Sequence, residues 1–385
     1  MQNEKSFPFW FRLFFSTTEC REHAKKVFMK KLLKMMSNIC MIFLFLFLAG
    51  SSLWACVLPE KQTVRVGLTT RSYHDADRDR NIKTYIWYPI QPVEKRVASG
   101  SFLAPFQLDK RLINDALPMA GTKPLVLFSH GTEGSVTNYS WFIRNLVENG
   151  FIVAGIDHPG NTWYDKTPDG YIAVWERPQD VSFVLTRLLK DSTIGPLIDA
   201  GRIAAAGHSA GGYTVLALAG AKYNMIQMIE FCSETENDPV CLFPDDINWS
   251  KMIKRFSSAR LSYADERIQA VFAMAPAVAQ GVDANSLKAI TVPVFLVGAI
   301  KDDVTPYKTN VAYYCANIHG AKLLKLDADE GHFIFLDLCT SFGRNIAGAL
   351  CRDHQSVDRQ AVHERLNAVA IEFFRDALGI PNEKN

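Results

Sequence analysis

The first chemical signal in the sequence is a serine held between glycines. The motif Gly207-His-Ser-Ala-Gly211 follows the apolar run 203–206 and leads into the apolar segment 212–219. A serine on a sharp turn between a strand and a helix stands clear of the packing, and small neighbours let the backbone bend that closely. The competing interpretation is a hydroxyl that only caps the helix. The pattern predicts that Ser209 is a nucleophile.

A serine hydroxyl attacks only when a base removes its proton, and an acid must orient that base. On a strand-turn-helix scaffold the three groups follow the chain order serine, acid, histidine, each in a loop after a strand. His332 fits this order because it follows the apolar run 322–326 through a short polar loop. The acid belongs to the loop after 292–297, where Asp302 and Asp303 are both within reach and residue type does not separate them.

Attack on an ester turns the carbonyl oxygen into an anion, so two backbone N–H groups must already point at it. One is the N–H of Ala210, directly after the serine. The other belongs to the glycine-containing loop 129–134, where Thr132 is the predicted donor. His130 in the same loop is as consistent with a structural role in the turn as with a role in this site. Together these residues predict acyl transfer through an acyl-enzyme.

Such residues need a scaffold that brings three loops to one edge. Short apolar runs alternate with segments of helical spacing; the runs are 123–129, 151–156, 202–207, 269–274, 292–297 and 322–326. Continuous apolar strands separated by helices predict an α/β fold, a mostly parallel sheet with helices on both faces. The loops after parallel strands meet at one edge of the sheet. Two alternating segments, 63–67 and 82–87, predict an antiparallel lead-in.

One stretch, about 222–265, interrupts this alternation with polar residues. It contains Trp249 and two cysteines, Cys232 and Cys241, which flank a turn-rich loop. We predict an insertion over the sheet that acts as a small cap, with a Cys232–Cys241 disulfide. The acyl chain length that the protein accepts then depends on how this segment folds over Ser209.

The remaining cysteines of the body allow one further pair. Cys339 with Cys351 is the second candidate disulfide, and Cys315 is either a buried core thiol or a partner for Cys56. The chain contains no Cys-x-x-Cys and no His-Glu-x-x-His pattern. We therefore expect no metal site.

Residues 1–56 are typical of a targeting segment. Three lysines within 30–34 precede the apolar run 39–50, and small residues follow it. A basic start, a short apolar stretch and a small-residue exit describe a secretory signal peptide. Met29 resembles a more usual start for such a signal, so 1–28 are interpreted as an upstream extension without a function of its own.

The end of this segment leaves three forms of export open. Besides a cleaved signal, Leu53-Trp-Ala-Cys56 resembles a lipoprotein box, which makes Cys56 a candidate for lipidation. An apolar segment extended over 39–58 is long enough for an uncleaved anchor. In every case the basic flank stays inside and the body, 57–385, is exported to the periplasm or beyond, with membrane attachment in two of them.

Composition excludes several classes of protein. The 385 residues are 48% hydrophobic and 21% charged, which is ordinary for a globular chain and excludes disordered and collagen-like proteins. Residues 1–56 hold eight Lys or Arg and three Asp or Glu, which leaves 34 basic against 37 acidic residues in the body. A slightly acidic body does not favour nucleic acid as a partner.

Several motifs in order carry a family resemblance that covers about residues 62–375. They are Asp77-Arg-Asp-Arg80 with Trp87-Tyr-Pro89, Pro124-Leu-Val-Leu-Phe-Ser-His-Gly131, Asp157-His-Pro-Gly160, Arg177-Pro-Gln-Asp180, Gly207-His-Ser-Ala-Gly-Gly212, and Gly331-His-Phe-Ile-Phe-Leu336 with Cys339. The chain resembles the α/β-hydrolases of the predicted dienelactone-hydrolase-like group, which are related to platelet-activating-factor acetylhydrolases. The resemblance implies Asp302 rather than Asp303 as the acid, and a hydrolase without a metal or organic cofactor. One departure is that true dienelactone hydrolases use a cysteine nucleophile, whereas this chain has Ser209.

The residues and the resemblance together predict an exported serine hydrolase of carboxylic esters. Its expected partner is a small-molecule or lipid ester, such as a short-chain ester or the sn-2 acyl ester of a phospholipid. Thioesters and polyesters also stay open. A serine peptidase on the same fold and a non-catalytic binding protein on a hydrolase scaffold are the alternatives.

Overall fold

The computed structural model describes residues 60–97, 104–107, 109–235 and 238–381. Its centre is a sheet of strand order β11-β10-β9-β8-β4-β5-β2-β1-β3. The strands are β1 (Glu60–Asp75), β2 (Arg80–Val97), β3 (Ile113–Asn114), β4 (Lys123–Ser129), β5 (Ile152–Asp157), β8 (Ile198–His208), β9 (Val271–Met274), β10 (Val294–Ala299) and β11 (Lys322–Leu326). A separate short pair comprises β6 (Asn161–Thr162) and β7 (Asp165–Lys166).

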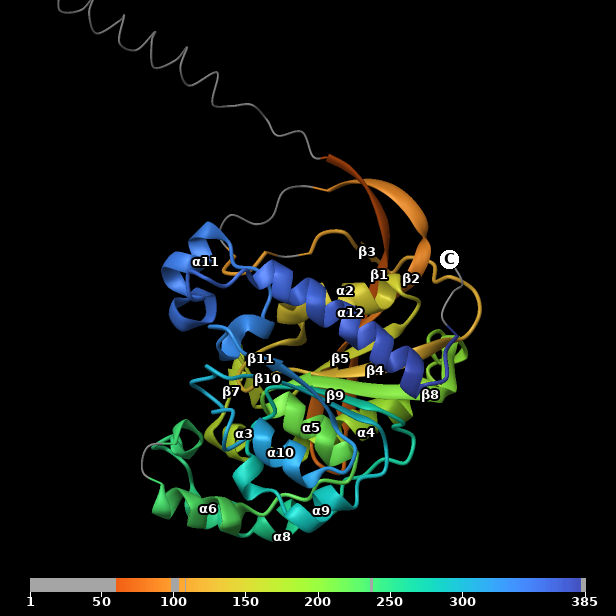
Figure 1. Ribbon diagram of the computed structural model, residues 1–385. Helices are drawn as coiled ribbons and strands as arrows, with labels where there is room; N and C mark the ends of the chain where they lie inside the picture. Colours follow the sequence, from red (N-terminus) through yellow and green to blue (C-terminus); the bar gives the residue numbers. More distant parts are fainter. Residues whose placement is uncertain (1–59, 98–103, 108, 236–237, 382–385) are drawn as a thin grey trace, which may run out of the picture. The chain divides into compact units, whose positions relative to one another are not determined.

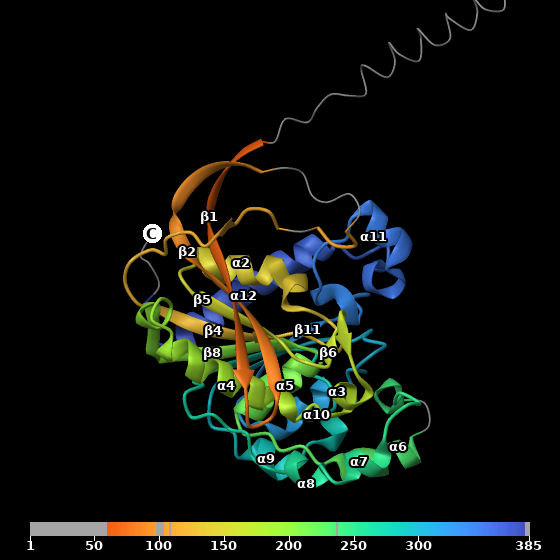
Figure 2. The ribbon, with the colours of Figure 1, turned by 180° about the vertical axis from the view of Figure 1, so that it is seen from behind.

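The strands from β11 across to β5 all run parallel to their neighbours. β2 pairs antiparallel with β5, and β1 pairs antiparallel with β2 along most of its length. Figure 2 shows β1 and β2 as two long curved strands. The predicted apolar strands and the antiparallel lead-in are confirmed, although the lead-in is longer than the alternation indicated because its outer part is an exposed two-stranded ribbon.

Helices cover both faces of the sheet, which explains why β5 and β9 are entirely buried. The principal helices are α2 (Ser140–Glu148), α3 (Pro168–Ile172), α4 (Glu176–Lys190), α5 (Ala210–Leu218), α9 (Ala284–Lys288), α10 (Val311–Asn317), α11 (Ser341–Ile346) and α12 (Arg359–Ala377). One apolar core joins the sheet to α2 and α12, and another joins it to α4, α5, α9 and α10. Figure 1 shows the two groups on opposite sides of the sheet.

This arrangement is the α/β-hydrolase fold, as predicted. The segment 222–265 forms α6 (Met225–Glu234), the 3₁₀ turn η4 (Pro239–Cys241), α7 (Trp249–Ile253) and α8 (Phe256–Ala259). These short helices gather at one end of the molecule, beyond α5 and α10 (Figures 1 and 2). Within the described residues no helix is long and apolar enough to cross a membrane. The predicted signal, anchor and Cys56 lie outside the described residues.

Candidate active site

Ser209 occupies the turn between β8 and α5, at the carboxyl edge of the parallel strands. Its backbone has φ 58° and ψ −121°, a positive-φ conformation that few non-glycine residues adopt. A side chain at Gly207 or Gly211 would collide with backbone atoms, of Gly211 and of Ser129 respectively, so both positions require glycine. The Ser209 side chain makes no capping hydrogen bond to α5, which removes the capping interpretation.

The structure brings Ser209, His332 and Asp302 together although up to 123 residues separate them. His332 begins the 3₁₀ turn η6 (His332–Phe335), and its Nε2 lies 3.0 Å from Ser209 Oγ. Its Nδ1 lies 2.8 Å from Asp302 Oδ2. Since a carboxylate only accepts, Nδ1 carries the proton and Nε2 is free to accept the serine proton. All three residues are buried.

Asp302 is held by the turn that it starts. Its Oδ1 accepts the backbone N–H groups of Val304 at 3.0 Å and Thr305 at 2.7 Å. The Thr305 hydroxyl donates to Asp302 Oδ2 at 2.9 Å. Asp303 is exposed. The structure therefore distinguishes the two neighbours: Asp302 contacts His332, and Asp303 faces the solvent.

Most backbone N–H groups near the serine already donate hydrogen bonds within the protein. In the loop after β4, the N–H of Gly131 donates to the Tyr139 hydroxyl at 3.1 Å and that of Glu133 to Asn161 Oδ1 at 2.7 Å. Thr132 lies between them, and both Thr132 and Ala210 line the pocket that contains Ser209. A position beside the serine in this pocket is one that an oxyanion donor must have.

A network of buried charges lies behind this loop and is built from motifs to which the sequence assigned no role. His158 Nδ1 donates to Asp180 Oδ2 at 3.0 Å, and His158 Nε2 accepts the Ser129 hydroxyl at 2.9 Å. Arg80 donates twice to Asp180, at 2.7 and 2.6 Å. His158 and Asp180 are completely buried. The network joins the motifs at 77–80, 157–160 and 177–180 to the end of β4.

His130 belongs to this network. Its Nδ1 lies 2.6 Å from the carbonyl oxygen of Gly131, its Nε2 accepts the backbone N–H of His158 at 3.1 Å, and Arg177 donates to its carbonyl oxygen. Burial lowers the pKa of His130 well below its usual value and lowers that of His158 to about 3. Both rings are therefore neutral near pH 7, and His130 shapes the loop, which favours its structural interpretation.

Ser209 and His332 line a mainly apolar cavity of about 690 Å³, and with Asp302 they are called the triad below. Such a volume suits one small organic molecule or one acyl chain. The walls come from residues 104–106, the loop after β4, the segment 163–174, the cap segment 222–265, the turns near 277 and 304, and the C-terminal part of the chain. Their apolar members include Phe106, Trp163, Ile172, Val174, Tyr223, Met225, Met228, Val240, Phe243, Val278, Phe333, Leu336 and Leu350.

The cap wall is tied together by a disulfide. Cys232 at the end of α6 pairs with Cys241 in η4, as predicted. Met225 and Met228 of α6 and Val240 of η4 line the cavity. The bond therefore links two segments that each contribute to the wall.

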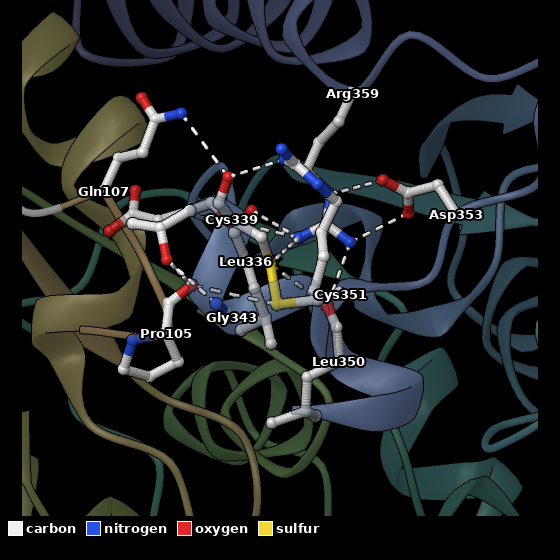
Figure 3. Close-up of a disulfide and its surroundings, with 12 residues drawn as sticks. Pro105, Gln107, Leu336, Cys339, Gly343, Leu350, Cys351, Asp353 and Arg359 are labelled. Atoms are coloured by element: carbon white, nitrogen blue, oxygen red, sulfur yellow. Dashed lines mark hydrogen bonds and ion pairs between the residues drawn. A yellow bond between two sulfur atoms is a disulfide. The ribbon is translucent and has the colours of Figure 1, made fainter. Parts of the chain in front are cut away.

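A second disulfide stabilises the opposite wall. Cys339 pairs with Cys351, and Arg359 at the start of α12 donates to the carbonyl oxygen of Leu350 at 3.0 Å and to the Asp353 carboxylate at 2.8 Å (Figure 3). The carbonyl of Pro105 accepts the N–H of Thr340 at 3.0 Å. The disulfide thus anchors Leu336 and Leu350 beside the segment 104–106, all of which line the cavity. Among the cysteines in the described ranges, Cys315 is half-buried and unpaired.

Three residues close to the triad escaped sequence reasoning. Thr305 follows Asp302 by three positions, a spacing typical of a side chain that closes a turn, and this signal was available. His208 stands at the variable position of the serine motif, so the pattern carries no information about it. Tyr139 belongs to none of the motifs. In the described part of the chain, no cluster of three or more His, Cys, Asp or Glu side chains is arranged to hold a metal ion.

Part of the chain matches a known protein family. Residues 97–164, which include the loop after β4, match the family described as platelet-activating factor acetylhydrolase, isoform II. No curated protein matches the chain.

Several solved structures are similar to this chain. A ferulic acid esterase from Streptomyces cinnamoneus superposes with a TM-score of 0.57 at 18% identity, over 83% of this chain and 92% of the esterase. A puromycin-hydrolyzing peptidase of Mycobacterium tuberculosis reaches 0.46 at 14% identity, over 82% of this chain and 40% of its own. An acylaminoacyl peptidase of Pyrococcus horikoshii has a TM-score of 0.46 at 13% identity, over 85% of this chain and 43% of the peptidase. The chain thus has the α/β-hydrolase fold, and residues 97–164 are similar to the family of platelet-activating factor acetylhydrolase, isoform II.

Proposed function

We propose that the protein is a serine hydrolase of carboxylic esters. The observation that carries the proposal is the continuous path from Asp302 Oδ2 through His332 to Ser209 Oγ, with contacts of 2.8 and 3.0 Å, at the base of an apolar cavity. A base held in one tautomer against a serine hydroxyl is the arrangement that activates that hydroxyl for attack.

The mechanism uses groups that this chain supplies. Ser209 Oγ attacks the ester carbonyl carbon while His332 Nε2 takes the hydroxyl proton, and Asp302 stabilises the imidazolium that forms. The N–H groups of Thr132 and Ala210 hold the resulting oxyanion. Collapse breaks the bond to the alcohol, which leaves with the proton from His332. Water then attacks the acyl-enzyme by the same route and regenerates Ser209.

The cavity supports an ester with an apolar acyl group as the substrate. Its lining is mainly aliphatic and aromatic, and its volume of about 690 Å³ encloses one chain rather than a large polymer. We propose short-chain esters and the sn-2 acyl ester of phospholipids as the substrate classes to examine first. The cap segment 222–265 is the wall that selects among chain lengths.

We also propose that the protein acts outside the cytoplasm. The two disulfides support this, because such bonds persist in oxidising compartments. Attachment to a membrane through the N-terminal segment or a lipidated Cys56 stays a prediction, which mass spectrometry of the membrane fraction tests directly.

The test is hydrolysis of p-nitrophenyl esters from acetyl to palmitoyl, and of a phospholipid with a short sn-2 chain, by the full-length protein. Ser209→Ala should abolish turnover and labelling by a fluorophosphonate. The matched control is Ser258→Ala, which removes a hydroxyl that donates to the Arg255 carbonyl in the cap and should keep the activity. Most of the rate persisting in Ser209→Ala would exclude the mechanism, and cleavage of peptides but not esters would favour a peptidase.

A further inference from the structure

Two buried side chains beneath the triad have no part in the chemistry above. Tyr139 ends the 3₁₀ turn η2 (Val136–Tyr139), and His208 ends β8 immediately before Ser209. Their exposed fractions are 1% and 2%. The rings of His208 and His332 lie 4.7 Å apart. Both side chains are polar, so their hydrogen bonds must be made within the protein.

The hydrogen bonds that pass through these two residues all run from donor to acceptor in the same direction. His208 Nε2 lies 3.2 Å from the carbonyl oxygen of His332, which only accepts, so Nε2 carries the proton. Burial lowers the pKa of His208 well below its usual value, so the ring is neutral and Nδ1 is an acceptor. The Tyr139 hydroxyl, 3.0 Å from Nδ1, therefore donates to it and accepts the N–H of Gly131 at 3.1 Å.

These hydrogen bonds connect the two halves of the site. At one end they fix Gly131, whose carbonyl belongs to the same peptide group as the Thr132 N–H. At the other end they fix the backbone of His332. The packing is tight: a Cβ on Gly131 would come within 3.2 Å of Ser209 Cβ and 3.3 Å of His208 Nδ1.

We propose that Tyr139 and His208 are positioning residues that set the spacing between the oxyanion donor Thr132 and the base His332. Each is held by the other, because the Tyr139 hydroxyl has one proton to give and His208 Nδ1 is its acceptor. Loss of either side chain breaks the same connection, so the two act as a unit. The inference rests on the proposed ester hydrolysis.

The test compares Tyr139→Phe, His208→Leu and the double variant in the full-length protein. Tyr88→Phe is the matched control, because the buried Tyr88 hydroxyl also donates a hydrogen bond, at 2.9 Å to the Ala116 carbonyl, and lies on β2 away from the triad. The measurements are kcat and KM for p-nitrophenyl butyrate, inhibition by a trifluoromethyl ketone and melting temperature. This ketone adds to Ser209 and places an oxyanion on the same donors.

Each single variant should lower kcat about 10- to 100-fold with KM within about threefold, and should weaken inhibition by a similar factor. The double variant should be no more than about twofold slower than the slower single variant. Tyr88→Phe should lose stability but keep kcat. His208→Gln retains a donor and an acceptor, so it should recover part of the activity that His208→Leu loses. If Tyr139→Phe does not fold, the comparison of His208→Gln with His208→Leu tests the inference in its place.

The inference would be overturned if kcat of the double variant fell by the product of the two single-variant factors. Unchanged inhibition by the ketone, or a lower melting temperature with kcat intact, would overturn it as well. The rate of fluorophosphonate labelling of Ser209 is a readout that needs no ester. If the unaltered protein hydrolyses no ester but is labelled, the proposed substrate class fails while the labelling rates of the variants still decide whether Tyr139 and His208 position the site.

Discussion

Asp302 and Asp303 show how one residue's surroundings decide its chemistry. Asp302 is buried and receives three hydrogen bonds from the turn 302–305, all of which fix its carboxylate toward His332. Asp303 is exposed to solvent. Only a fixed acceptor holds the imidazole in the tautomer that leaves Nε2 unprotonated, so the two neighbours cannot substitute for each other.

Asp302→Asn should therefore lower kcat by about 10³- to 10⁴-fold, because the amide permits the wrong tautomer of His332. Asp303→Asn removes an equal charge one residue away and should leave kcat within about twofold. Steady-state kinetics with p-nitrophenyl butyrate measures both. Equal losses in the two variants would show that the effect comes from the charge of the loop and not from the orientation of His332.

At this scale the sequence predicts residues that lie in patterned turns and misses those that act through packing. Ser209 is predictable because a strand ends at the residue before it, and His332 because a short polar loop joins it to the strand 322–326. The choice of Asp302 needed either the resemblance or the structure, since reach along a loop is the same for neighbours. Tyr139 and His208 meet only in the folded protein, across 69 positions, and no local pattern marks such a contact.

At the scale of secondary-structure elements, the cap shows how short helices depend on a cross-link. Its helices α6, α7 and α8 are short, of five residues or fewer except for α6, and α6 contributes Met225 and Met228 to the cavity wall. Isolated helices of this length are not stable alone. The Cys232–Cys241 bond therefore has a large share in holding the wall.

Replacing both Cys232 and Cys241 by serine should lower the free energy of unfolding by about 2–3 kcal/mol, the entropy of closing a loop of about ten residues. The acyl-chain preference should broaden toward longer esters, because Met228 and Val240 are no longer fixed. Cys315→Ser, at a half-buried and unpaired thiol, is the control and should keep the chain-length profile. A profile that stays sharp in the double variant would show that the cap does not select the chain.

The elements that the sequence predicts are those with a continuous apolar run between turns, which is why every strand from β4 to β11 in the main sheet has a counterpart in the pattern. The wall formed by 336–351 has no such signal. It is built from short turns that rest on 104–107, more than 230 positions away, and it depends on hydrogen bonds such as that from Gln107 N–H to the Leu338 carbonyl at 2.7 Å. Such contacts leave no periodicity in the chain.

Across the whole molecule, several histidines are buried in neutral form, which couples folding to pH. His363 on α12 stacks on Trp141 at 4.0 Å and its Nε2 donates to the carbonyl of Ile334 at 2.8 Å. Burial lowers the pKa of His363 to about 4, although the hydrogen bond to Ile334 opposes the shift. In the unfolded chain a histidine titrates near pH 6.5. The unfolded state thus binds more protons between pH 4 and 6.5, and stability falls as the pH drops through that window.

His363→Gln should flatten this dependence because glutamine keeps a donor for Ile334 but does not titrate. Between pH 7 and pH 4 the variant should lose about 3 kcal/mol less than the unaltered protein, which is the free energy of a shift from about 6.5 to about 4. Urea unfolding at pH 7, 5.5 and 4 measures it. His319→Gln, at an exposed histidine, is the matched control for replacing a histidine by glutamine. Parallel stability curves for His363→Gln and the unaltered protein would show that acid sensitivity arises elsewhere in the buried network.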